Sequence, residues 1–107
     1  MSYMLVNVIP GFNQDKYDQV RAKMGLDKPD AMWPDGMIQH HAGALEDGGW
    51  CIVEEWRSHE DFQRFCDAQP KDPKMLEEMG DVKQQWFKVY HAHHADEESE
   101  SEFQKAA

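Results

Sequence analysis

Four residues of this chain have side chains that could act on a small molecule. Asn7 lies in an apolar run near the N-terminus, and its amide can donate a hydrogen bond to an oxyanion. Trp56 ends another strand-like run, and its indole can orient a flat ring and donate through its N–H. His40 and His41 are adjacent, and an imidazole can accept a proton near neutral pH. The structural alternatives are a hydrogen bond within the fold for Asn7 and core packing for Trp56.

A second group of histidines lies further along the chain. His91 and His93 are separated by one alanine, and His94 follows them. Residues two apart on a strand point to the same face, so both imidazoles could bind zinc, copper or nickel. Two ligands form an incomplete site, and the alternative is an exposed strand end. A divalent metal at His91 and His93 is therefore kept as an alternative.

The elements that position these residues follow from hydrophobic periodicity. Runs rich in β-branched and aromatic residues predict strands, and apolar residues at helical spacing predict helices. The order β-α-β-β-α-β is typical of a ferredoxin-like α+β fold with an antiparallel sheet. The predicted strands are residues 3–9, 37–45, 50–56 and 85–93, and the predicted helices are 13–25 and 58–69, with a short extra helix at 73–80.

Turn and capping residues define the connections. Asp47 and Gly48 predict a tight antiparallel hairpin between the second and third strands. Ser58, followed by Asp61, predicts the start of the second helix. The loop 26–36 carries Trp33, which contacts a ligand if the loop folds over a pocket and is otherwise pinned to the core.

Several other positions are interpreted as structural. Tyr17 and Val20 belong to an apolar stripe on the first helix. Glu54 and Glu55 are expected to be solvated or ion-paired positions of the third strand. The residue pattern predicts no functional role for them.

Length and charge limit the classes of protein that fit. The 107 residues suit one domain, expected over residues 1–94, followed by an acidic tail at 95–107 that we expect to be solvated and mobile. The formal net charge of −10 disfavours nucleic acid and membrane partners. No apolar stretch approaches the ~18 residues that span a bilayer, and no secretory pattern is recognised, so a cytoplasmic protein is expected.

The first and last predicted strands carry apolar residues on both faces, as Trp86 and Phe87 illustrate. Helices that cover one face of the sheet leave the other face without a partner. We therefore expect a homodimer in which two sheets pack face to face as a barrel.

Residues 53–62, with the sequence VEEWRSHEDF, resemble the junction of a Trp-ended strand and a Ser-capped helix in the antibiotic biosynthesis monooxygenase-like (ABM) superfamily. The resemblance covers residues 3–93 and is most specific at 56–65. It implies a dimeric α+β barrel. Some members of that family oxygenate aromatic polyketides or quinols without metal or flavin, some degrade haem, and many have no established activity.

The haem-degrading branch of the family has an Asn on the first strand, a Trp ending the third strand and a His on the following helix. Asn7 and Trp56 match the first two positions. His59 is in the first turn of that helix, and Cys66 stands where the iron-binding His is expected. A thiolate can bind haem iron, but Cys66 also fits a small buried hydrophobe. Haem is therefore disfavoured, and no cofactor is expected.

The resemblance implies oxygenation of a small aromatic or quinol, in which a substrate anion gives an electron to dioxygen in a dry pocket. It assigns catalysis to Asn7 and Trp56. The chemistry of imidazole adds His40 or His41 as the base, and alternation places these two side chains on opposite faces without showing which is inward. The expected ligand contacts are Trp33, Phe62, Phe65 and Cys66. The alternatives are a non-catalytic binder of a small apolar ligand and a metal-binding structural dimer.

Overall fold

The computed structural model describes residues 1–95 of the chain and confirms the predicted ferredoxin-like α+β fold. The helices are short, from 7 to 10 residues, and across residues 1–95 none is long and apolar enough to cross a membrane. The predicted acidic tail falls, from residue 96 onward, outside the described residues. The elements are β1 Tyr3–Ile9, α1 Gln14–Lys23, β2 Met37–Ala44, β3 Trp50–Trp56, α2 His59–Ala68, α3 Pro73–Met79 and β4 Lys83–Lys88.

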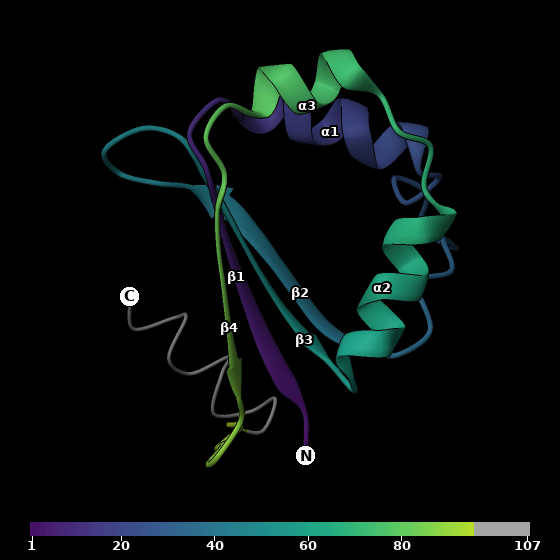
Figure 1. The fold of residues 1–107 in the computed structure, drawn as a ribbon, viewed down its shortest axis with the longest axis vertical. Coiled ribbons are helices and arrows are strands. Elements are labelled where there is room, and N and C mark those ends of the chain that lie inside the picture. The colour runs from purple at the N-terminus through teal and green to yellow at the C-terminus, as the bar shows by residue number, and fades with distance from the viewer. Residues whose placement is uncertain (96–107) are drawn as a thin grey trace.

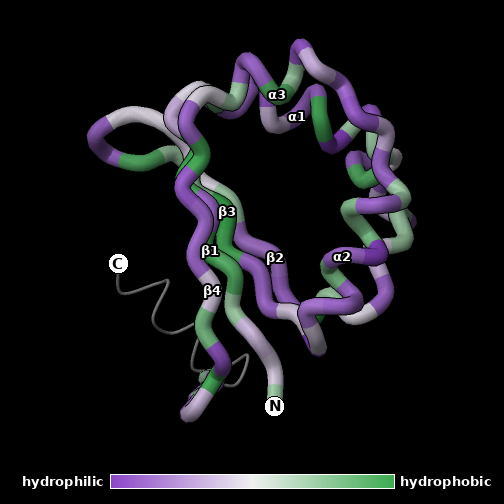
Figure 2. Tube along the Cα trace, viewed as in Figure 1, coloured by the Kyte–Doolittle hydropathy of each residue, from purple (hydrophilic) through white to green (hydrophobic). Residues whose placement is uncertain are grey.

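The strands form an antiparallel sheet in the order β2-β3-β1-β4. In the part of the chain described, α1, α2 and α3 all lie on one side of this sheet (Figure 1). Figure 2 shows β1 and β3, the central strands, as the most hydrophobic part of the sheet and the edge strand β2 as largely hydrophilic. The core therefore lies between the central strands and the helices.

Alternate residues of the central strands fill that core. Leu5 and Trp56 are fully buried, and Ile9 and Trp50 pack with Phe12 in a cluster near α1 and α3. The opposite face of β1 carries Val6 and Val8, which are half-buried. The two-residue alternation of a strand thus separates an inner face under the helices from an outer face.

The predicted local signals are confirmed. The side chain of Asn13 accepts from the backbone N–H of Lys16 and caps α1, and Ser58 caps α2 in the same way. Gly48 and Gly49 take positive φ angles of 99° and 89° in the hairpin turn, where a side chain would be strained. These residues determine where the elements begin and turn.

The last strand differs from the prediction. It spans Lys83–Lys88 and not residues 85–93. Lys88 pairs with Tyr3, the first residue of β1, and the backbone N–H of Val89 donates to Ser2, so the pairing of β4 with β1 ends there. His91 and His93 consequently follow the sheet and do not share a strand face.

A buried carboxylate holds the start of α2. Asp61 is 4% exposed and accepts hydrogen bonds from Arg57, Ser58 and Arg64. These donors, Arg57 above all, hold the pKa of Asp61 far below its usual range. The backbone N–H of Arg57 also donates to Gly36, which fixes the end of the loop before β2.

We predict that Asp61→Asn lowers the urea midpoint most at neutral pH. The folded-state pKa lies below the unfolded value of about 4, so the carboxylate stabilises the fold above that pH, and this stabilisation is lost as the pH falls. The gap between wild-type and variant midpoints should therefore shrink from about pH 4 downward. Asp67→Asn, at an exposed position of the same helix, is the control. A gap independent of pH would contradict the prediction.

Candidate functional site

A cavity of about 240 Å³ lies between the sheet and the helices. Its wall is mainly apolar and is built from residues of all four strands, of α1, α2 and α3, and of the loop before β2. Asn7, Tyr17, Arg21, His40, Glu54 and Gln84 are polar residues of this wall.

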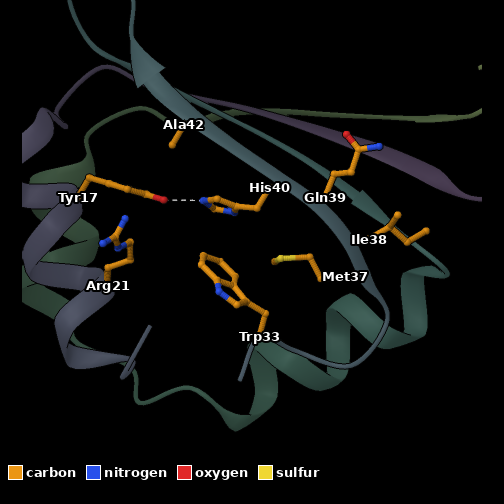
Figure 3. A pocket seen from close by; sticks show the side chains of 8 residues that line it. All are labelled: Tyr17, Arg21, Trp33, Met37, Ile38, Gln39, His40 and Ala42. Atoms are coloured by element: carbon orange, nitrogen blue, oxygen red, sulfur yellow. Dashed lines mark hydrogen bonds between the residues drawn. The ribbon is translucent and has the colours of Figure 1, made fainter. Parts of the chain in front are cut away.

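A more open hollow of about 430 Å³ lies beside β2 (Figure 3). It shares Tyr17, Arg21, Trp33, Met37 and His40 with the cavity. The shared residues therefore form the boundary between the interior and the hollow.

A hydrogen-bonded chain crosses this boundary. Glu54, which is 8% exposed, has its Oε2 2.8 Å from Nδ1 of His40, and Nε2 of His40 is 2.5 Å from the hydroxyl of Tyr17. An ionised carboxylate only accepts hydrogen bonds, so we assign the proton on the imidazole to Nδ1. Nε2 then accepts the hydrogen bond from Tyr17 (Figure 3).

Burial raises the pKa of Tyr17 above its ordinary value, although nearby Arg21 opposes this. The phenol therefore keeps its proton at neutral pH and can donate it to His40. The arrangement of a carboxylate, an imidazole and a hydroxyl is a route along which a proton can move.

The strand register decides which of the two neighbouring histidines faces the cavity. His40 pairs with Glu54 across β2 and β3, on the row that continues to buried Leu5. His41 points to the opposite face, is exposed, and contacts Gln39 with its Nε2 at 3.3 Å. The structure therefore brings His40 and not His41 into the cavity wall.

Asn7 also reaches the cavity. Its Oδ1 accepts a hydrogen bond from Nε2 of Gln84 at 3.0 Å across β1 and β4. Its amide nitrogen is the group left to donate to a ligand. Trp33, predicted as a ligand contact, lines both the cavity and the hollow, with its ring centroid 5.0 Å from that of His40.

Trp56 lies behind the site and does not line the cavity. It is fully buried, packs against Phe62 and Phe65, and donates from Nε1 to Oε1 of Glu54 at 3.0 Å. Of the predicted contacts on α2, Phe65 lines the cavity, whereas Phe62 and Cys66 do not. Trp56 therefore supports the acid that orients His40.

His91 and His93 are exposed and follow β4, which forms the opposite edge of the sheet from β2. Across residues 1–95 no group of three or more His, Cys, Asp or Glu side chains could hold a metal ion. Because the strand ends at Lys88, the shared strand face on which the metal alternative rested is not formed.

The described residues also do not fit haem. In the cavity wall His40 supplies the imidazole, and both of its nitrogens are hydrogen-bonded. His59 is packed between two aromatic rings. Burial raises the pKa of the Cys66 thiol, which keeps it from the thiolate form that binds iron.

Sequence reasoning missed Glu54, Tyr17 and Arg21. Glu54 is buried, so its interpretation as a solvated strand position was wrong, and the contact of its carboxylate with His40 was not foreseen. The hairpin contained a signal, because counting back from the paired Ala44 and Trp50 places His40 opposite Glu54.

Together these features define a class: a ferredoxin-like α+β domain with a mainly apolar cavity between its sheet and helices. No protein-family model and no curated protein matches this sequence. Solved structures do match, and they include antibiotic biosynthesis monooxygenases. The ferredoxin-like α+β fold of the single chain is thereby confirmed, and the dimeric barrel stays a prediction.

One match is a monooxygenase from ActVA-Orf6 of Streptomyces coelicolor in complex with nanaomycin D, with a TM-score of 0.58, 15% identity, and 89% of this chain and 93% of that chain covered. SnoaB, a cofactor-independent oxygenase from Streptomyces nogalater, matches with a TM-score of 0.56 and 16% identity, over 85% of this chain and 95% of that chain. A heme-degrading protein from Mycobacterium tuberculosis matches with a TM-score of 0.54 and 12% identity, over 88% of this chain and 100% of that chain. The structural similarity establishes the fold, and identities this low leave the activity open.

We predict that Trp56→Phe lowers the free energy of unfolding by about 1–3 kcal/mol, because it deletes the donor to a buried carboxyl oxygen of Glu54. Urea denaturation measures the change. Trp33→Phe is the control; that ring is 41% exposed, and the expected change is within about 0.5 kcal/mol. Equal losses in the two variants would contradict the supporting role of Trp56.

Proposed function

We propose that this protein is a cofactor-independent monooxygenase that acts on a small phenol or hydroquinone. The observation that carries the proposal is the chain from Glu54 through His40 to Tyr17 at the edge of an apolar cavity. Oxygenation without a cofactor requires removal of a substrate proton in a site that excludes water. The relay serves the first requirement and the apolar wall serves the second.

In this mechanism the substrate hydroxyl donates to the oxygen of Tyr17. As the substrate proton passes to Tyr17, the proton of Tyr17 passes to Nε2 of His40, and the carboxylate of Glu54 stabilises the imidazolium. The substrate anion then gives one electron to dioxygen. The resulting radical pair forms a peroxide, and loss of water leaves a quinone, so that a phenol and O₂ become a quinone and H₂O.

Asn7 is assigned to the oxyanion in this proposal. Its amide nitrogen can donate to the negatively charged oxygen, and such donors act most strongly where water is excluded. Trp33 is assigned to the face of the substrate ring. Trp56 acts at a distance, because it holds Glu54, which in turn orients His40.

Matches to solved structures support the proposal at the level of the fold. SnoaB is described as a cofactor-independent oxygenase, and the Streptomyces coelicolor monooxygenase holds nanaomycin D. The heme-degrading protein shares the fold. The residues that would bind iron here do not fit that chemistry, so the cofactor-independent reaction is the better-supported one.

We predict that His40→Gln and Tyr17→Phe each slow oxygen uptake about 10²- to 10⁴-fold with 1,5-dihydroxynaphthalene as the probe. An oxygen electrode and detection of the hydroxynaphthoquinone product provide the measurement. His41→Gln is the matched control, because its neighbouring imidazole points to the other face. Loss of activity in His41→Gln alone would refute the assignment of the base.

A non-catalytic binder is the second candidate. It is favoured by the hydrogen bonds on both nitrogens of His40, which leave the imidazole without a free acceptor for a substrate. In that case 1,5-dihydroxynaphthalene should raise the melting temperature through binding to the folded state while no oxygen is consumed.

We also propose a homodimer formed through the outer face of the sheet. Val6 pairs with Val53 on this face, and Phe87 is 54% exposed there. The described helices all lie on the other side (Figure 1). A second copy placed face to face would bury these groups along a two-fold axis.

Val6→Lys should convert the dimer to a monomer, because it places an unpaired charge at the centre of the buried face. Light scattering after size-exclusion chromatography measures the mass. Ala22→Lys, at an exposed position of α1, adds the same charge away from this face and should remain dimeric. A monomeric wild-type protein would refute the dimer.

A further inference from the structure

One polar atom beside the cavity has no hydrogen-bond partner. Arg21 extends from α1, and its Nε is buried without an acceptor among residues 1–95. Its guanidinium carbon lies 5.8 Å from the centre of the Tyr17 ring. Arg21 lines both the cavity and the hollow beside β2, and Figure 3 shows it between Tyr17 and Trp33. The unpaired donor is therefore next to the residue that begins the proton relay.

This unpaired donor is unexpected in an acidic protein. The chain has 21 acidic against 11 basic residues, so carboxylate acceptors are plentiful. Arg57 and Arg64 share Asp61, whereas no ion pair involves Arg21 within the described part of the chain. A buried donor without an acceptor costs free energy, which is recovered if a ligand supplies the acceptor.

We propose that Arg21 selects substrates that carry a second oxygen acceptor, a carbonyl or carboxylate, in addition to the reacting hydroxyl. This inference rests on the proposed function. The hydroxyl contacts Tyr17, the second oxygen accepts from the guanidinium of Arg21, which lines the cavity, and the ring lies against the apolar wall. The guanidinium also favours the anion that forms when the hydroxyl loses its proton.

The test compares the binding of three probes to the purified protein: 1-naphthol, 3-acetyl-1-naphthol and 4-hydroxy-2-naphthoate. The added groups lie meta to the hydroxyl and form no internal hydrogen bond with it. Tryptophan fluorescence, to which Trp33 contributes, reports the Kd. Wild-type protein should bind one or both of the substituted probes about 10- to 100-fold more tightly than 1-naphthol. Tighter binding of 3-acetyl-1-naphthol identifies a carbonyl as the acceptor, and tighter binding of 4-hydroxy-2-naphthoate identifies a carboxylate.

Variants assign the preference to Arg21. Arg21→Gln should bring the ratio of Kd values close to one. Lys23→Gln removes the same charge from the same helix at a side chain that is 66% exposed, and it should keep the wild-type ratio. Where Arg21→Gln does not fold, Arg21→Lys provides the test, since it keeps the charge and lacks the planar guanidinium with its several donors; it should lose preference for the acetyl probe.

The outcomes separate this inference from the proposed function. Equal binding of the three probes by wild-type protein, or a preference that survives in both Arg21 variants, overturns the role of Arg21. Oxygen uptake with 1,5-dihydroxynaphthalene but no preference refutes the inference and leaves the monooxygenase proposal standing. A preference lost in Arg21→Gln but without oxygen uptake supports the binding role and refutes the monooxygenase.

Discussion

The contact between Glu54 and His40 is the interaction on which the site depends. A buried carboxyl group requires donors, and Glu54 receives them from His40 and Trp56. These bonds hold the imidazole in one tautomer and direct Nε2 toward α1. Tyr17 then meets it, so two strands and a helix are joined at the edge of the cavity. The apolar wall and the amide of Asn7 lie around this hydrogen-bonded group.

Most of the fold could be predicted because each signal is local. The β-α-β-β-α-β order, the helix cap at Ser58 and the hairpin turn depend on residues that are close in sequence, and each is confirmed. The length of the last strand was wrong, because it depends on a distant partner. Lys88 pairs with Tyr3 near the start of the chain, and alternating apolar residues beyond it cannot extend the sheet.

The site could be predicted less completely. Residue type alone indicated Asn7 and the two histidines, and Asn7 and His40 do reach the cavity. Glu54 was missed because a glutamate in a strand usually indicates an exposed position. Here its place on the inner face, opposite His40, determines its burial. Tyr17 and Arg21 required knowledge of how α1 lies over the sheet, a packing relation that neither helical spacing nor capping residues contain.

The short connection between β2 and β3 therefore has a chemical as well as a geometric effect. Strand side chains alternate, so a shift of pairing by one residue would exchange the inward histidine for its neighbour and move His40 to the far surface. A single insertion or deletion among residues 45–49 that shifted this pairing would change the cavity wall, although these residues do not line the cavity. Homologues of this chain are thus better compared first by the length of that turn, and only then by the identity of their side chains.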